Sequence, residues 1–164
     1  MSLVVQRFME SPLGTLRLVA TNDALVAVYF SSQRSAMINP CSLAPLDHPV
    51  LGLAQWELDE YFGAVRKTFA TPLAPRGTNF QALVWSALRE IPFGETRTYA
   101  EIARRVGRGR AMRAVGGANA NNPLSVFVPC HRVIGADGSL TGYDGGIDRK
   151  RWLLEHEGVA QKRS

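Results

Sequence analysis

A stretch rich in proline and glycine divides this chain into two parts of different charge. Residues 71–77 read Thr-Pro-Leu-Ala-Pro-Arg-Gly, a composition typical of a linker. Residues 1–75 contain five Lys/Arg and six Asp/Glu, whereas residues 76–164 contain 14 and eight. Because 164 residues suffice for two small domains but not for a larger assembly, we predict domains over residues 1–74 and 75–164.

The first domain has the pattern of a small antiparallel sheet. Its short apolar runs are separated by the turn sequences Ser-Pro-Leu-Gly and Asn-Asp, which predicts hairpins. The runs are residues 4–8, 15–20 and 24–30. Apolar residues spaced three to four apart predict a helix over residues 47–62. The expected fold class is therefore α/β (α+β).

The second domain is predicted to be mainly helical. Its first helix spans residues 80–91, with Thr78 or Asn79 as the cap. The buried stripe of this helix is expected to be Phe80, Leu83, Val84, Ala87 and Leu88. Further helices are predicted over residues 98–106, 110–119 and 148–156, and short β-strands over residues 125–128 and 132–135.

The helices over residues 98–106 and 110–119 are joined by a glycine-containing turn, as in a helix-turn-helix. The second of them carries Gly116 and Gly117 on one face, together with Arg113. Each glycine inside a helix costs about 1 kcal/mol relative to alanine, so close approach to another surface must offset the loss. Two interpretations remain: tight packing against another helix, or close approach to a nucleic-acid groove.

The basic excess favours a nucleic-acid partner. Residues 97–132 contain seven arginines and a single acid, Glu101, which is the charge pattern of a phosphate-backbone binder or of a solvated basic face. No apolar run is long enough for a membrane span, and no signal peptide is recognised, so we expect a cytoplasmic protein with no membrane association. Two cysteines supply neither a disulfide scaffold nor a zinc finger, so no metal is expected.

The tetrapeptide Pro129-Cys130-His131-Arg132 is the segment of the chain whose residue types most suggest chemistry. An adjacent imidazole and nearby arginines are expected to lower the pKa of the Cys130 thiol. Consecutive side chains diverge, so His131 is expected to act through a bridging water. Glu155 and Glu157 are both candidates to orient the imidazole. On these grounds alone, a purely structural role for the Cys-His pair also stands.

Four motifs together resemble the O6-alkylguanine-DNA alkyltransferase family, also called methylated-DNA-protein-cysteine methyltransferases. They are Arg-Ala-Val-Gly-Gly-Ala from Arg113, Asn122-Pro123, Pro-Cys-His-Arg-Val-Ile-Gly from Pro129, and Gly-Tyr-Asp-Gly-Gly from Gly142. The resemblance covers residues 78–158. It implies a ribonuclease-H-like N-terminal domain with an antiparallel sheet, followed by a winged helix-turn-helix domain.

The resemblance implies a self-inactivating transfer. Cys130 would accept the alkyl group from O6-alkylguanine in double-stranded DNA, leaving O4-alkylthymine as an open second substrate. His131 would be the water-mediated base, and the matching position of Glu157 selects it over Glu155 as the orienting carboxylate. Tyr99 would donate to the guanine ring, and Asn122 would tie the active-site turn to the helix-turn-helix.

Further residues are implied in DNA and substrate binding. Arg113 would fill the place of the flipped base, while the second helix enters the minor groove with low sequence specificity. That helix contacts DNA through Arg113, Ala114, Gly116, Gly117 and Ala118, together with Tyr99. The guanine would be bound by Val133, Tyr143, Asp144 and Gly145. The expected state is a monomer without cofactors, and cooperation along DNA is left open.

Some positions depart from the pattern, and two other functions compete. Thr141 and Asn119 stand where some members have glycine and methionine, which leaves the accepted alkyl size open. One alternative is a sequence-specific regulator that reads the major groove with Cys130 inert. The other is a cysteine hydrolase, which requires direct Cys-His contact and repeated turnover.

Overall fold

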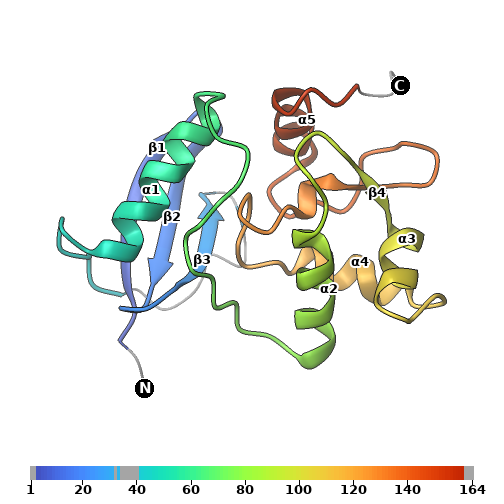
Figure 1. The fold of residues 1–164 in the computed structure, drawn as a ribbon, viewed down its shortest axis with the longest axis horizontal. Coiled ribbons are helices and arrows are strands. Elements are labelled where there is room, and N and C mark those ends of the chain that lie inside the picture. Colours follow the sequence, from blue (N-terminus) through green and yellow to red (C-terminus); the bar gives the residue numbers. More distant parts are fainter. Residues whose placement is uncertain (1–2, 32, 34–40, 161–164) are drawn as a thin grey trace. The chain divides into compact units, whose positions relative to one another are not determined.

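The computed structural model describes residues 3–31, 33 and 41–160. The chain divides into two compact units, residues 1–76 and 77–164 (Figure 1). None of the helices in the described part of the chain is long and apolar enough to cross a membrane. The expected fold class, a small antiparallel sheet followed by a mainly helical unit, is confirmed.

The first unit is a three-stranded antiparallel sheet in the order β1-β2-β3, with one helix packed against it (Figure 1). The elements are β1 (Val5–Ser11), β2 (Gly14–Ala20), β3 (Leu25–Phe30) and α1 (Pro49–Phe62). Leu16 pairs with Phe30 across β2 and β3, and both side chains are fully buried. The helix contributes fully buried Leu58 and Tyr61 to the core of this unit. The two predicted hairpins and the helix are thus confirmed.

The predicted linker is partly incorporated into this sheet. Leu73 forms a parallel bridge with Leu25 at the start of β3, closed by hydrogen bonds from Leu25 N to Pro72 O and from Ala74 N to Leu25 O. The bridge stays short because proline has no N–H to donate, and Pro72 and Pro75 flank it. Residues 72–74 are therefore an edge of the sheet.

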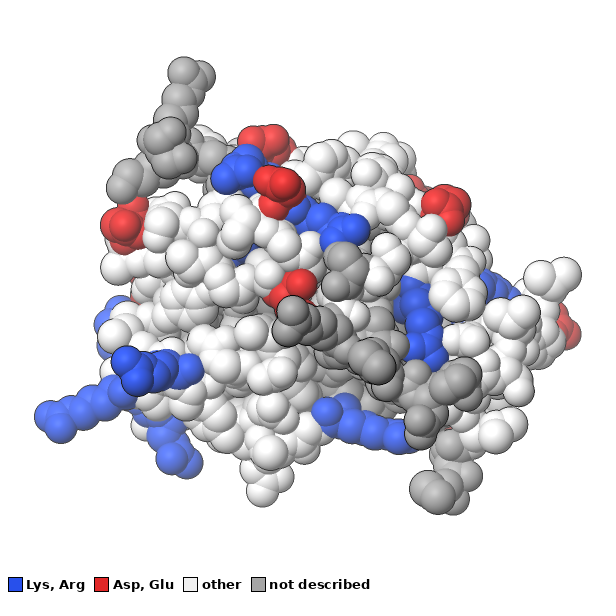
Figure 2. All heavy atoms as spheres, turned by 180° about the vertical axis from the view of Figure 1, so that it is seen from behind, with Lys and Arg blue, Asp and Glu red and all other residues white. Residues whose placement is uncertain are grey.

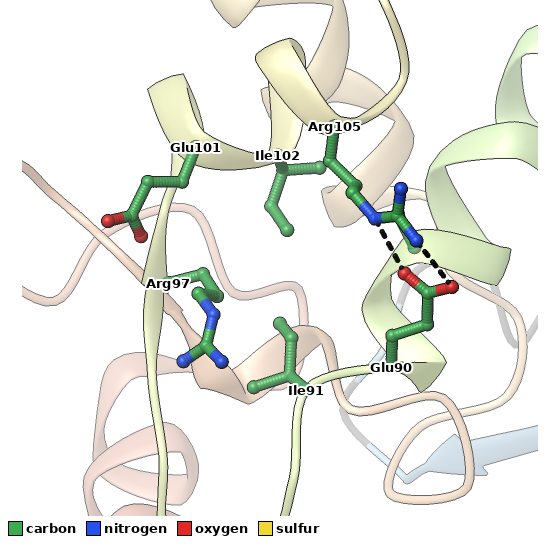
Figure 3. A pocket seen from close by; sticks show the side chains of 7 residues that line it. Glu90, Ile91, Arg97, Glu101, Ile102 and Arg105 are labelled. Carbon is green, nitrogen blue, oxygen red and sulfur yellow. Dashed lines mark hydrogen bonds and ion pairs between the residues drawn. The ribbon is translucent and has the colours of Figure 1, made fainter.

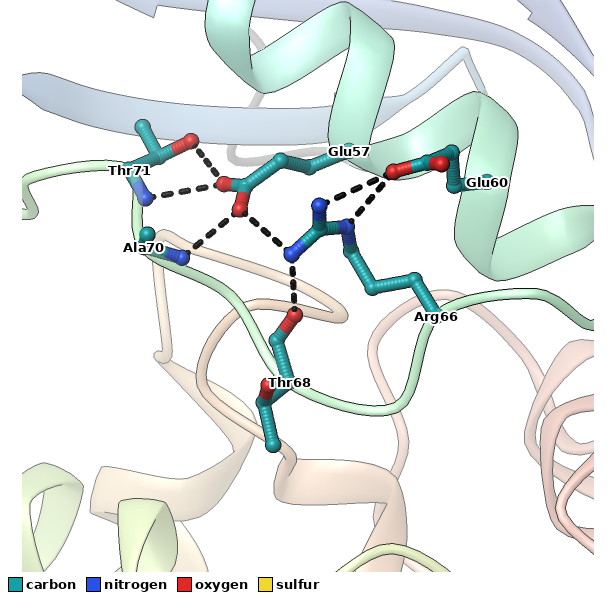
Figure 4. Close-up of polar contacts among 6 residues, drawn as sticks. All are labelled: Glu57, Glu60, Arg66, Thr68, Ala70 and Thr71. Atoms are coloured by element: carbon teal, nitrogen blue, oxygen red, sulfur yellow. Dashed lines mark hydrogen bonds and ion pairs between the residues drawn. The ribbon is translucent and has the colours of Figure 1, made fainter.

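A buried carboxylate anchors the chain that leaves α1 (Figure 4). Glu57, fully buried on α1, accepts hydrogen bonds from Ala70 N (2.7 Å), Thr71 N (2.8 Å) and the Thr71 hydroxyl. Arg66 Nη1 lies 3.1 Å from the same carboxylate, and its Nη2 lies 2.9 Å from Glu60. These contacts fix residues 66–71 because a buried charge is stable only when it is paired and hydrogen-bonded.

Within its described residues, 77–160, the second unit has four α-helices around a short parallel ladder. The helices are α2 (Asn79–Arg89), α3 (Tyr99–Arg105), α4 (Met112–Ala120) and α5 (Ile147–His156). The paired strands are β4 (Arg97–Thr98) and β5 (Val133–Ile134), and a 3-10 turn spans Cys130–Arg132. Thr78 caps α2 and Thr98 caps α3, each through a reciprocal capping box. All four predicted helices of this unit are confirmed.

The buried stripe of α2 differs from the prediction. Leu83 is 49% exposed, whereas Trp85 is 2% exposed. The indole Nε1 of Trp85 donates to Ala118 O of α4 at 2.9 Å, so the ring is buried with its polar atom satisfied. A Cβ on Gly77 would lie 2.4 Å from the Trp85 ring, so only glycine permits this packing. The tryptophan, not the leucine, therefore joins α2 to α4.

The predicted strand over residues 125–128 is wrong, because this segment is a turn. Asn122 accepts from Leu124 N (3.0 Å) and donates through Nδ2 to Val128 O (2.8 Å). An extended run would separate residues 122 and 128 by about 20 Å, beyond the reach of one side chain. Val126 takes a positive φ of 75°, which is unusual for a β-branched residue. The turn leads directly into Cys130.

Candidate active site

Cys130 lies in a buried turn held by two asparagines, one in the last turn of α4 and one just after the helix ends. Besides the bonds of Asn122, Asn119 Nδ2 donates to Cys130 O at 3.3 Å, and Asn119 is 1% exposed. The contact of Asn119 was missed from sequence, where the residue stood out only as a departure from the family pattern. Both amides tie the acceptor turn to the helix that carries Arg113.

The Cys130 thiol is protonated at neutral pH, contrary to the expectation of a lowered pKa. Burial raises the pKa of Cys130 to about 11, while the Asn122 hydrogen bond and the Lys150 charge act in the opposite direction. The side chain is 4% exposed. The prediction failed because burial outweighs the neighbouring donors, and because the adjacent Arg132 guanidinium pairs with Glu157. Deprotonation therefore requires a base.

His131 is connected to Glu157, and Glu157 to Arg132. His131 Nε2 lies 2.8 Å from Glu157 Oε2, and both residues are buried, whereas Glu155 is exposed. Burial lowers the pKa of His131, although the Glu157 hydrogen bond raises it. Burial raises the pKa of Glu157, but His131 and Arg132 together hold it well below its usual value. The group is therefore a neutral imidazole on an ionised carboxylate.

The second ring nitrogen of His131, Nδ1, is available to accept a hydrogen bond. Nδ1 is buried and has no hydrogen-bond partner among the described residues. Because the ionised Glu157 carries no proton, Nε2 is the donor in their bond, and the neutral ring leaves Nδ1 as an acceptor. The direct Cys-His hydrogen bond that a cysteine hydrolase requires is absent from this part of the structure.

Lys150 is a buried cation near the acceptor that sequence reasoning missed. It is fully buried, and its Nζ donates to Val133 O (2.5 Å) and Thr141 O (2.8 Å). Burial lowers its pKa to about 8. Its spacing along α5, three and four residues before buried Leu153 and Leu154, was the available signal, because a lysine at an apolar position of a helix calls for buried partners.

A pocket of about 740 Å³ brings several predicted site residues together. Tyr99, Arg113 and Gly116 line it with Thr141 and others. The Tyr99 hydroxyl donates to Thr141 O at 3.0 Å, so Thr141 O accepts from both Tyr99 and Lys150. Burial raises the pKa of Tyr99, and Cys130 adds to this effect, which places the thiol in its electrostatic neighbourhood.

The remaining predicted substrate residues differ in exposure. Val133 is fully buried, Tyr143 is 8% exposed and Gly145 is buried, whereas Asp144 is exposed. Burial raises the pKa of Tyr143 well above its usual value, and the Cys130 charge acts in the same direction. The two tyrosines and the acceptor thus share one electrostatic environment.

The glycines of α4 leave an open face. Arg113, Ala114 and Gly117 are exposed, and Gly116 is half-buried, while Ala118 lies on the buried side, where its carbonyl binds Trp85. A Cβ on Gly117 would meet nothing within 4 Å, and one on Gly116 would only touch Tyr99 at 4.0 Å. Tight helix packing within this chain therefore does not explain the two glycines.

The seven arginines of residues 97–132 do not form one surface. Arg132 is buried, and Arg97 and Arg105 are paired with glutamates. The remaining members are exposed: Arg104 near the end of α3, Arg108 and Arg110 in the α3–α4 turn, and Arg113 on α4. Figure 2 shows basic side chains projecting at the lower left, the end where Figure 1 places this turn. The basic surface is therefore smaller than predicted and lies beside the open face of α4.

A second hollow of about 350 Å³ carries charges of both signs (Figure 3). Arg105 forms a two-pronged ion pair with Glu90, and the glutamate that caps α3, Glu101, lies on the rim. Ile91 lines this hollow. No cluster of three or more His, Cys, Asp or Glu side chains suited to a metal ion occurs among residues 3–31, 33 and 41–160.

Comparison with known proteins accounts for both units. Residues 79–159 match the DNA binding domain of 6-O-methylguanine DNA methyltransferase, and residues 4–75 match its ribonuclease-like domain. A methylated-DNA–protein-cysteine methyltransferase of Methanosarcina acetivorans is 47% identical over 91% of this chain and 95% of its own. The constitutive enzyme of that name from Bacillus subtilis is 45% identical over 93% and 94%.

A solved structure agrees with these matches. The crystal structure of Mycobacterium tuberculosis OGT in complex with DNA has a TM-score of 0.86 and 45% identity, covering 93% of this chain and 91% of that one. The chain therefore belongs to the 6-O-methylguanine DNA methyltransferase family. The resemblance found from the motifs, including the ribonuclease-like first domain, is confirmed.

Proposed function

We propose that this protein repairs double-stranded DNA by taking the alkyl group of O6-alkylguanine onto Cys130. The thiolate sulfur attacks the alkyl carbon, a C–S bond forms, the C–O6 bond breaks, and guanine leaves with the electron pair. The proton released by the thiol balances the one gained by the departing guanine. The thioether is stable, so each molecule acts once. The observation that carries this proposal is a buried cysteine next in sequence to a histidine whose Nε2 is bound to Glu157 and whose Nδ1 has no partner among the described residues.

His131 is proposed as the base and Glu157 as its orienting group. Because the pKa of Cys130 is raised by burial, the thiol has to lose its proton during the reaction. A water between the sulfur and His131 Nδ1 would carry that proton, while the 2.8 Å contact with Glu157 stabilises the resulting imidazolium. Lys150 adds a positive charge near the sulfur. The reaction needs a free thiol, which the reducing cytoplasm maintains.

The guanine is proposed to enter the pocket beside Tyr99. The Tyr99 hydroxyl, which donates to Thr141 O at rest, would turn to a guanine ring nitrogen and stabilise the leaving base. The carbonyl of Val133 accepts a hydrogen bond from Lys150 and has a second lone pair for the base. The carbonyl of Cys130 already accepts from Asn119 and from Val133 N–H, so its contact with the base would replace the longer bond, from Asn119. Tyr143 and Gly145 are buried and do not line this pocket at rest, so they and the Asp144 amide would contact the base only after it has entered.

DNA is proposed to bind along the open face of α4 from the minor groove. Gly116 and Gly117 leave room for the backbone of a narrow groove, and the exposed arginines face the phosphates. Arg113 would enter the stack and hold the flipped nucleotide outside. Ala114 is exposed beside it, whereas buried Ala118 acts only by holding the helix. A single monomer suffices, since one molecule consumes one lesion.

The test is the intact mass of the protein after mixing with a duplex that carries one O6-methylguanine. We expect a gain of one methyl group, about 14 Da, located on Cys130 by peptide mapping and without further turnover. Cys130→Ser is expected to bind the duplex and gain nothing, and Cys41→Ser, altered outside the site, to react like the wild type. Binding without mass gain in the wild type would instead support the regulator interpretation.

A further inference from the structure

Arg132 is the charged member of the Pro-Cys-His-Arg motif to which the proposed reaction gives no role. It is 6% exposed and points away from the solvent that an arginine of a basic surface would face. Its Nε donates to Glu157 Oε1 at 2.8 Å and its Nη2 to Glu157 Oε2 at 3.0 Å, a two-pronged pair. Its Nη1 donates to Ile91 O at 2.7 Å, and its guanidinium lies over the Phe93 ring. The guanidinium is therefore fixed against Glu157.

Glu157 Oε2 is shared between two donors. It accepts from Arg132 Nη2 and from His131 Nε2, at 3.0 and 2.8 Å. The three groups carry charges of plus one on Arg132, minus one on Glu157 and zero on His131, so the buried set is neutral. Lys150 of α5 is a second cation near these groups, and the Cys130 thiol is next to His131 in the sequence. The charge of Lys150 lowers the pKa of His131 and so disfavours protonation of the imidazole.

We propose that Arg132 is a positioning residue for His131: by balancing the charge of Glu157, it keeps the imidazole in the neutral form protonated at Nε2, with Nδ1 open. This inference rests on the proposed function, in which Nδ1 takes the Cys130 proton through water. Arg132 touches neither substrate nor the reacting sulfur; it acts through its two hydrogen bonds to Glu157, and its own charge also lowers the pKa of His131.

Removal of Arg132 would change the number of protons that the His131–Glu157 pair binds. An unbalanced Glu157 would leave a buried negative charge, which is costly, so the His131–Glu157 pair would take up one proton. If the proton stays on the imidazole, both ring nitrogens are protonated. If it moves to the carboxyl group, that group donates to Nε2, and the neutral ring then carries its proton on Nδ1. Either way Nδ1 is blocked and the base is lost.

The experiment compares the pH dependence of single-turnover methyl transfer from an O6-methylguanine duplex in the wild type, Arg132→Gln and Arg132→Lys. For Arg132→Gln we expect the acidic limb to move to higher pH, so that the rate falls about tenfold or more near pH 7 and recovers near pH 9. Arg132→Lys keeps the charge and is expected to keep the position of the limb, with a lower plateau. Arg151→Gln removes an exposed arginine of α5 that pairs with Asp148, and serves as the matched control.

The proposal would be overturned if the acidic limb of the pH–rate profile stayed in place in a folded Arg132→Gln protein. It would also be overturned if Arg132→Lys moved that limb as far as Arg132→Gln does. Should Arg132→Gln not fold, nitrogen NMR of His131 in the wild type and in Arg132→Lys decides: because both keep the positive charge, the proposal requires an unprotonated Nδ1 near pH 7 in both. A protonated Nδ1 there refutes it. Absence of methyl transfer in the wild type would refute the proposed function itself, while the NMR result would still report on Arg132.

Discussion

The protonation state of Cys130 yields the most quantitative prediction. Burial raises the pKa of this thiol from an ordinary 9.0 to about 11, although Asn122 and Lys150 act to lower it. Each pKa unit changes the thiolate population tenfold, so at neutral pH the folded protein holds about 100-fold less thiolate than an ordinary cysteine would. The acceptor is therefore expected to be unreactive until a bound substrate and His131 assist it.

The same shift affects stability at alkaline pH. Between about pH 9 and pH 11 the unfolded chain has lost the Cys130 proton and the folded protein has kept it, so the unfolded state binds fewer protons. The free energy of unfolding therefore falls as the pH rises through this window, by about 2 to 3 kcal/mol for a shift of this size. Well below pH 9 the thiol is protonated in both states, so Cys130 contributes no pH dependence to the free energy of unfolding.

The assay is a difference titration between the wild type and Cys130→Ser, in which the second cysteine, Cys41, is common to both and cancels. Thiolate absorbance in the ultraviolet should appear in the difference only above about pH 9. Urea unfolding at successive pH values should show the wild type losing stability relative to Cys130→Ser over the same window. Thiolate absorbance already complete below about pH 8 would refute the reasoning, because burial would then not dominate.

Three further predictions concern DNA binding and stability. Gly117→Ala is expected to stabilise the protein by about 1 kcal/mol in thermal unfolding, since its Cβ meets open space, and to weaken DNA binding in a titration; unchanged binding would contradict the groove interpretation. Arg113→Ala should lose transfer from duplex DNA and keep reactivity toward free O6-methylguanine; equal losses on both would argue against base flipping. Glu57→Gln should destabilise the first unit by about 2 kcal/mol in urea unfolding, because the amide NH2 replaces a buried oxygen that accepts from Ala70 N or Thr71 N, whereas exposed Asp59→Asn should change little.

Features set by neighbours in the chain were predictable from the sequence. The cap at Thr78 and the turns between β1, β2 and β3 depend on local hydrogen bonding, and they appear where the sequence predicted them. The order and spacing of the motifs around Cys130 identified the family, because the chemistry requires those residue types together. The failed strand over residues 125–128 shows the limit, since Asn122 closes that segment through side-chain bonds that propensity does not register.

The electrostatic state of the site was decided only by the tertiary structure. Sequence proximity predicted that Arg132 would lower the pKa of Cys130, but the fold directs that guanidinium to Glu157, 25 residues away. Lys150 and Asn119 reach the acceptor turn only because α5 and α4 pack around it. The reason is that burial and charge pairing depend on distances through space, which a one-dimensional pattern of residues does not contain.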